Sequence, residues 1–269
     1  MNEHREGAVY LYCLAKSDLL PAVDGIGVDG RNALFLHRSE GIAAVLSVVH
    51  LDEFFGPRAE SSMKDISWVG PRAVLHETVV EQVMRHSPVL PAGFGTVFSS
   101  LEGPRNLLKT HRDTICRFLE WAAGKEEWAL KALVDRRKAK DELVSEGLRR
   151  EVRYLNSLFP GKRYFEERRI RNEAEKELDG HLQEVCQKIL SELKSSTFDA
   201  RERKVLPVSA DGMETAANWA LLVPRAEVSA LQARIDRANV DCAKKGLVFQ
   251  MSGPWPPYSF CPSLGSEGS

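Results

Sequence analysis

The order of strands and helices in the second half of the chain most narrows the folds open to it. A strand with apolar residues on one side is predicted first, and two helices follow, the longer of which carries an apolar stripe. Two strands joined by an Asp-Gly turn come next, then a helix and a short last strand. The expected elements lie at 127–134, 136–158, 164–195, 204–209, 216–223, 226–244 and 247–251. This is the ferredoxin-like βαββαβ order with one helix inserted.

The first half shows a related order in which a glycine-rich loop replaces the first crossover helix. A polar segment at 51–64 is expected to be mobile. Ser99 and Glu102 have the spacing of a capping box, which predicts that a helix begins there. The expected elements are strands at 9–15, 33–37 and 42–49, a helix at 67–86, a glycine-interrupted strand at 88–98, and a helix that ends near Ala123.

Together the two halves predict an α+β protein with two ferredoxin-like domains, the first of them a variant. We expect the N-terminal domain at 1–125 and the C-terminal domain, with its inserted helix, at 126–252. The remaining residues, 253–269, form a tail rich in proline and aromatic residues.

The tail contains the segment Gly253-Pro-Trp-Pro-Pro-Tyr-Ser-Phe260. Its prolines exclude a helix and a central strand, and they favour an extended path that loses little entropy when fixed. Trp255, Tyr258 and Phe260 are therefore candidate partner-binding residues, since interfaces favour such rings. The alternative is a strap that packs Trp255 and Phe260 against the second domain, and one segment can do both.

Composition limits the classes of partner and compartment. Lys and Arg number 37 against 38 Asp and Glu, a net charge of -1, so nothing draws the whole chain to nucleic acid or to an anionic membrane. Five cysteines lie far apart without a C-x-x-C pair, which favours free thiols in a reducing cytosol. No apolar run is long enough for a membrane span. We expect a soluble, intracellular protein.

The motifs that suggest chemistry have simpler interpretations. His76-Glu77 is not a zinc-protease motif, because Val80 occupies the second histidine position, and a packed, hydrogen-bonded histidine is favoured. Gly93-Phe-Gly-Thr96 lacks the remainder of a phosphate-binding loop and predicts a backbone bend. Residues 136–171 hold twelve basic against six acidic side chains, which favours a solvated helical face over contact with acidic protein or RNA.

These observations favour binding or assembly over catalysis. We expect no catalytic residue, no cofactor and no metal site. The competing class is a small-molecule-binding or enzymatic protein on a ferredoxin-like fold, which would need a concave pocket with convergent polar groups and a strongly shifted pKa.

Several segments, in order along the chain, resemble the gas vesicle proteins of the F/L type, the GvpF/GvpL family. The resemblance covers residues from about Ala8 to Pro262. It implies a cytoplasmic, non-enzymatic minor component needed to form gas vesicles, and two domains of this kind. It also implies contact with the small hydrophobic shell subunit and with other minor gas vesicle proteins, and no membrane or nucleic acid partner. The matching segments are 9–15, 42–49, His76-Glu77, 88–97, 127–131, 161–165 and the ending from 247 to Phe260.

Overall fold

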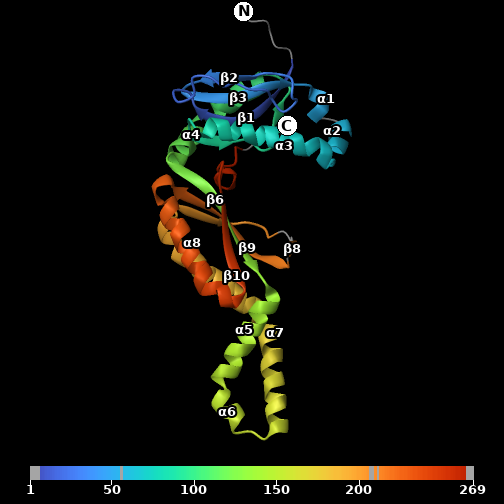
Figure 1. Ribbon diagram of the computed structural model, residues 1–269. Helices are drawn as coiled ribbons and strands as arrows, with labels where there is room; N and C mark the ends of the chain where they lie inside the picture. The colour runs from blue at the N-terminus through green and yellow to red at the C-terminus, as the bar shows by residue number, and fades with distance from the viewer. Residues whose placement is uncertain (1–6, 55–56, 206–208, 211, 265–269) are drawn as a thin grey trace, which may run out of the picture. The chain divides into compact units, whose positions relative to one another are not determined.

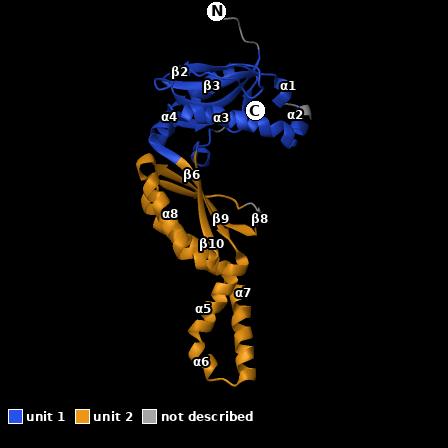
Figure 2. Ribbon diagram, viewed as in Figure 1, with its two compact units in different colours: residues 1–126, 255–269 blue, residues 127–254 orange. Residues whose placement is uncertain are grey.

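The structure is a computed structural model that describes residues 7–54, 57–205, 209–210 and 212–264 (Figure 1). It divides into two compact units (Figure 2). Unit 1 holds residues 1–126 together with 255–269, and unit 2 holds residues 127–254. The expected α+β class is confirmed, since each unit packs helices against an antiparallel sheet.

The sheet of unit 1 has the order β2-β3-β1-β4, and β5 also pairs with β1. β1 lies in the interior of the sheet and is buried along almost its whole length, as its apolar sequence predicts. The register with β3 shifts between Leu11 and Cys13, which places a bulge at Tyr12. The strands are β1 (Ala8–Lys16), β2 (Leu34–Ser39), β3 (Ile42–Val49), β4 (Val89–Pro91) and β5 (Val97–Phe98).

The long helix of unit 1 begins where a local side chain satisfies a free backbone N–H group. Asp65 caps the long helix α3 by accepting a hydrogen bond from the Ser67 N–H group at 2.9 Å. α3 then buries His76, Val80 and Val83 against the sheet. The helices are α1 (Leu51–Phe54), α2 (Pro57–Ser62), α3 (Ile66–Met84) and α4 (Glu102–Ala122).

Two expectations for unit 1 are corrected. The segment 51–64 was expected to have no regular structure, but α1 and α2 form there because Phe54 and Ala59 reach the interior, and residues 55–56 lie outside the described residues. The helix start predicted from the capping-box spacing of Ser99 and Glu102 is wrong by about two residues. α4 begins at Glu102, and Ser100 Oγ accepts a hydrogen bond from the Glu102 N–H group at 3.3 Å.

Unit 2 has the sheet order β10-β6-β9-β7, and β8 pairs with β9. The predicted face of β6 is confirmed, because Leu130, Ala132 and Val134 are buried in the core with Trp219. The strands are β6 (Lys125–Val134), β7 (Asp199–Glu202), β8 (Ser209–Ala210), β9 (Met213–Pro224) and β10 (Leu247–Trp255). The helices are α5 (Arg136–Arg150), α6 (Val152–Asn156), α7 (Pro160–Leu193) and α8 (Val228–Cys242).

The expected strand at 204–209 is the main error in unit 2. The strand that pairs with β9 over four residues is the polar β7, in which Asp199 lies opposite Leu222. Of the predicted range, residues 206–208 lie outside the described residues, and Ser209 belongs to the two-residue strand β8. β10 continues to Trp255 through Pro254. Proline has no N–H group to donate to a neighbouring strand, and β10 tolerates this because it lies at the edge of the sheet.

Candidate functional site

One histidine and three tyrosines, most of them buried, form a hydrogen-bonded and stacked cluster in unit 1. His76 is 2 % exposed, and its Nδ1 lies 2.9 Å from the Tyr10 hydroxyl. Its Nε2 lies 3.1 Å from the hydroxyl of Tyr258, which comes from the tail. The imidazole also stacks on Tyr12, with 5.6 Å between ring centroids. The expectation of a packed, hydrogen-bonded histidine is therefore confirmed.

The hydrogen bonds of this cluster run in one direction. The Tyr258 hydroxyl donates to Glu77 Oε2 at 3.0 Å, so its oxygen accepts from the His76 Nε2–H group. His76 Nδ1 must then accept from Tyr10, whose oxygen accepts from the Gly95 N–H group at 2.9 Å. The chain starts at a backbone donor and ends at a carboxylate.

Tyr12 ties the glycine-rich loop to the sheet. Its hydroxyl accepts a hydrogen bond from the Val28 N–H group and is bonded to Ser47 Oγ, both at 2.8 Å. A Cβ atom at Gly27 would lie only 2.7 Å from the Tyr12 hydroxyl and would also collide with Ser47. A glycine at this place lets the loop approach the sheet closely enough for that bond.

Burial fixes the protonation states of the cluster. It lowers the pKa of His76 to about 4, against the smaller opposing effect of the Ala92 backbone. Burial also raises the pKa of Tyr12 to about 12, and it raises the pKa values of Tyr10 and Tyr258 still further. At neutral pH the imidazole is neutral and the phenols keep their protons. Such groups are suited to holding the tail in place.

The Gly93-Phe-Gly-Thr96 segment is a bend, as expected. Its backbone and side-chain donors are engaged locally, because the Thr96 hydroxyl donates to the Gly93 carbonyl oxygen at 2.7 Å. Gly95 has a φ of +85°, which favours glycine, and its N–H group is directed at Tyr10. The N–H group that could have faced a phosphate therefore supports the tyrosine cluster instead.

The three tail residues predicted to bind a partner have different environments. Phe260 is 3 % exposed and packs on Trp121 of α4, and Tyr258 is engaged by His76 and Glu77. The expected strap of Trp255 and Phe260 against the second domain is corrected for Phe260, which packs on unit 1 because α4 supplies Trp121. Trp255 is 39 % exposed and is the tail ring with the most accessible surface.

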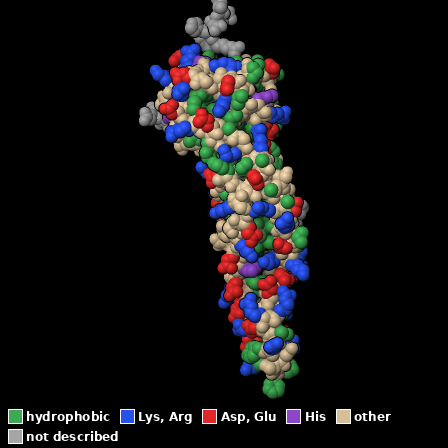
Figure 3. Space-filling model, turned by 90° about the vertical axis from the view of Figure 1, so that its left-hand side faces the viewer, with side chains coloured by type: hydrophobic (Ala, Val, Ile, Leu, Met, Phe, Trp, Pro, Cys, Tyr) green, Lys and Arg blue, Asp and Glu red, His purple; other side chains and the backbone are tan. Residues whose placement is uncertain are grey.

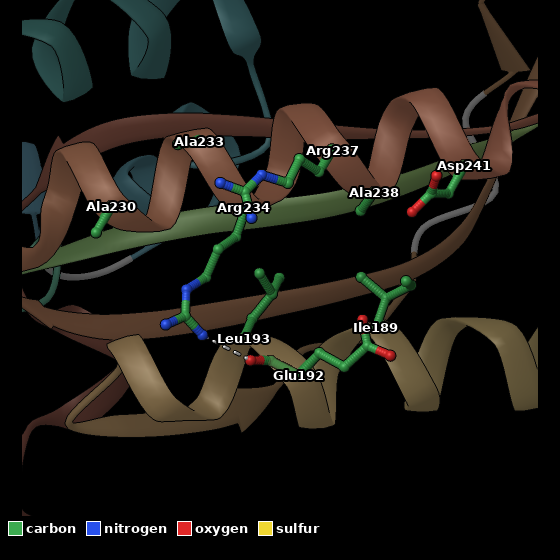
Figure 4. A pocket seen from close by; sticks show the side chains of 9 residues that line it. All are labelled: Ile189, Glu192, Leu193, Ala230, Ala233, Arg234, Arg237, Ala238 and Asp241. Atoms are coloured by element: carbon green, nitrogen blue, oxygen red, sulfur yellow. Dashed lines mark hydrogen bonds between the residues drawn. The ribbon is translucent and has the colours of Figure 1, made fainter.

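A groove of about 460 Å³ lies in unit 2 between α7 and α8 (Figure 4). Arg234 crosses one side of it and donates to the Glu192 carbonyl oxygen at 3.3 Å. The groove is lined by Ile189, Glu192, Leu193, Ala230, Ala233, Arg234, Arg237, Ala238 and Asp241. The strongly lowered pKa of His76 belongs to the other unit, and the thiols of unit 2 with raised pKa values, Cys186 and Cys242, lie in the core and do not line the groove. A ligand site would be expected to combine the two features.

Within the described ranges, no cluster of three or more His, Cys, Asp or Glu side chains is arranged to hold a metal ion. In the same part of the chain, no helix combines the length and the apolar character that a membrane crossing requires.

The family is settled by a match along almost the whole chain. The model of the family described as "Gas vesicle synthesis protein GvpL/GvpF" matches residues 8–262. The chain belongs to this gas vesicle family. A relative described as gas vesicle protein L, from Streptomyces sp. (strain CB03234), is 25% identical over 259 residues, which cover 93% of this chain and 91% of the relative.

Solved structures of the GvpL/GvpF family share the fold. The gas vesicle protein GvpF from Anabaena sp. PCC7120 matches with a TM-score of 0.70 at 18% identity, covering 96% of this chain and 99% of that chain. GvpF from Microcystis aeruginosa matches with a TM-score of 0.66 at 17% identity, covering 95% and 99%. Membership of the GvpL/GvpF family indicates a role in gas vesicle formation.

Sequence reasoning found the bend and the packed histidine but missed the partners of the histidine. Tyr10 and Tyr12 were assigned only to a half-buried or buried strand, and nothing in the spacing connects them to Tyr258. One available signal was the pair of tyrosines at alternate positions of an apolar strand, because buried phenols require hydrogen-bond partners.

Proposed function

We propose that this chain is a non-enzymatic minor gas vesicle protein that binds the hydrophobic shell subunit during nucleation or assembly, in the cytoplasm and at the growing vesicle. The GvpL/GvpF match over residues 8–262 carries this proposal. The character of the His76 cluster supports it, because the hydrogen-bonding capacity of the cluster is used to hold the tail. Other minor gas vesicle proteins are further partners in the proposal.

The fold offers edges to which a partner strand could add. The order β10-β6-β9-β7, with helices between β6 and β7 and between β9 and β10, is that of a ferredoxin-like domain. We propose that fold for unit 2 and a variant of it for unit 1. β2 is an edge of the unit 1 sheet and is only partly buried. An extended segment of the shell subunit could hydrogen-bond there.

Trp255 is the part of the tail that we assign to partner binding. Its ring is partly exposed and belongs to the last residue of β10, so its backbone is held in an extended strand. A pre-ordered aromatic ring loses little entropy on binding. Tyr258 and Phe260 would contribute by holding this arrangement.

Co-purification with the shell subunit tests the proposal. Full-length protein, a Trp255→Ser variant and an Ile66→Ser control are each co-expressed with a tagged shell subunit. Ile66 is 80 % exposed in unit 1, so Ile66→Ser also removes an exposed apolar side chain and serves as the control for Trp255→Ser. We expect recovery with the wild type and the control, and reduced recovery with Trp255→Ser. Failure of the wild type to accompany the shell subunit would refute the proposed function.

A further inference from the structure

Unit 2 presents a cluster of exposed aromatic side chains at the end of the α5–α6–α7 hairpin. We define the hairpin tip as residues 152–165, which span α6 and the first turns of α7. Phe159 is 85 % exposed, Phe165 68 % and Tyr164 61 %. Val152 and Tyr154 are each about half exposed. Figure 3 shows hydrophobic side chains gathered at the lower end of the view, where these elements lie in Figure 1.

The hairpin tip does not need these rings for its own packing. Leu155 and Ile170 are the buried residues of this end, and a Cβ atom at Gly147 would lie 2.7 Å from the Ile170 side chain. α5 and α7 therefore meet closely without the aromatic residues. Contiguous apolar surface of this kind, on a helical end that is already packed, marks an interaction site.

Ion pairs hold the hairpin in position. Arg136 contacts Asp179 at 2.7 Å, and Lys140 contacts Glu175, so two pairs join α5 to α7. Nearer the tip, Arg169 contacts Glu151 at 3.0 Å and also bonds Glu166 and Glu173 on its own helix. The aromatic rings are thus presented on a fixed support, which reduces the entropy lost on binding.

The charges of the hairpin tip have one sign. Residues 152–165 include Arg153, Lys162 and Arg163 but no Asp or Glu. Arg163 contacts Glu167 just outside the tip, whereas Arg153 and Lys162 make no ion pair within the described part of the chain. A second copy of the same surface would bring these charges together, so self-association of tips is opposed. An apolar segment bordered by carboxylates complements both the exposed aromatic rings and the positive charges of the tip.

We propose that the hairpin tip is a second docking surface, which binds an amphipathic segment of the shell subunit whose apolar face is bordered by Asp or Glu side chains. This inference rests on the proposed function and assigns its contact to named residues of unit 2. Anionic membrane and RNA are less consistent with the structure, because the three basic side chains of the tip would neutralise few phosphates.

The test measures binding of the full-length protein to the co-expressed, tagged shell subunit. One variant removes the rings (Phe159→Ser with Phe165→Ser), and a second reverses charge (Arg153→Glu with Lys162→Glu). The matched controls are Val240→Ser, an apolar residue that is 76 % exposed on α8, and Lys176→Glu, an exposed charge on α7 away from the tip. Thermal melting of every variant confirms folding.

We expect each tip variant to reduce recovery of the shell subunit about tenfold or more, as loss of central aromatic anchors does at other interfaces. The melting temperatures of all variants, and the recovery with both controls, should stay at wild-type values. Raising the salt concentration should weaken wild-type binding more than binding of the charge-reversed variant. Wild-type binding that both tip variants retain in full would overturn this inference and leave the proposed function standing. Absence of wild-type binding would refute both.

Two further assays address other partners of the tip. Wild-type protein and both tip variants are incubated with phosphatidylglycerol-containing vesicles and, separately, with single-stranded RNA. We expect no tip-dependent binding to either. Tip-dependent binding to vesicles or RNA, combined with unchanged recovery of the shell subunit, would assign the surface to that other class of partner and overturn the inference.

Discussion

Tyr258 Oη lies 3.1 Å from His76 Nε2, although 182 residues separate the two in the chain. The contact joins the tail to the middle of α3. It lies within unit 1, so the last described residues complete a unit whose sheet begins at residue 8. The tail is thereby part of the folded unit.

Removal of the Tyr258 hydroxyl should destabilise the protein. Tyr258→Phe keeps the ring but deletes the bonds to His76 and Glu77, which leaves a buried imidazole N–H group without that acceptor. We expect the free energy of unfolding to fall by about 1–3 kcal/mol. Urea denaturation measures the change. Tyr164→Phe is the control, since that tyrosine is 61 % exposed, and an equal loss in both variants would contradict the role of the bond.

Acid should weaken unit 1 through His76. Its pKa is lowered from 6.5 to about 4 by burial, so the unfolded chain takes up a proton first as the pH falls. The stabilisation is complete above pH 6.5 and is lost progressively from 6.5 towards 4. Between pH 7 and pH 5 we expect a loss of about 2 kcal/mol, since one pKa unit corresponds to ~1.4 kcal/mol.

The pH series is measured by urea denaturation at each pH, with His76→Gln as the comparison. The variant starts from lower stability but should lose less between pH 7 and pH 5. Asp65 titrates in a lower range, because its hydrogen bonds to Ser67 lower the pKa of its carboxyl group. Parallel pH dependence in the wild type and the variant would show that another group is responsible.

Strands and helices with a clear apolar face were predictable, because burial of that face determines them. β1 and the stripe on α7 from Ile170 to Leu193 are examples. β7 was missed, because three of its four residues are polar and they form a strand only through pairing with β9 at the sheet edge. The short α1 and α2 were missed for a similar reason, since the interior position of Phe54 depends on distant residues.

The candidate site was predictable only one residue at a time. Val80 in place of a second histidine was enough to assign His76 a packed role. Its partner Tyr10 lies 66 residues away, and no local pattern encodes that distance. The tail was recognised as stiff and aromatic, but its docking face depends on Trp121 and Glu77. The expectation that no exposed aromatic side chains accompany the basic stretch 136–171 is wrong, because the exposure of Phe159, Tyr164 and Phe165 depends on the fold.

The native thiols should differ in reactivity. Cys13, Cys186 and Cys242 are buried, and burial raises the pKa of each, that of Cys186 to about 11. Cys116 is only half-buried. Cys261 has the same intermediate burial. We expect iodoacetamide at pH 7.5 to alkylate Cys116 and Cys261 first and the three buried thiols only in urea, as read by peptide mass spectrometry. Equal labelling of Cys13 and Cys116 in native protein would contradict this burial pattern.

Gly253 should resist substitution because it lies within β10, close against the neighbouring strand β6. Its φ is +146°, and a Cβ atom there would lie 3.0 Å from both the Glu127 carbonyl oxygen and the Trp128 ring. Gly253→Ala therefore adds backbone strain and crowding, and we expect a loss of about 1–3 kcal/mol in the free energy of unfolding.

Gly180 is the matched control, since it lies in α7 with no neighbour near an added Cβ atom. Gly180→Ala should raise stability by up to about 1 kcal/mol through helix propensity. Urea denaturation separates the two effects, and a stabilising Gly253→Ala would show that the backbone at this position is not constrained.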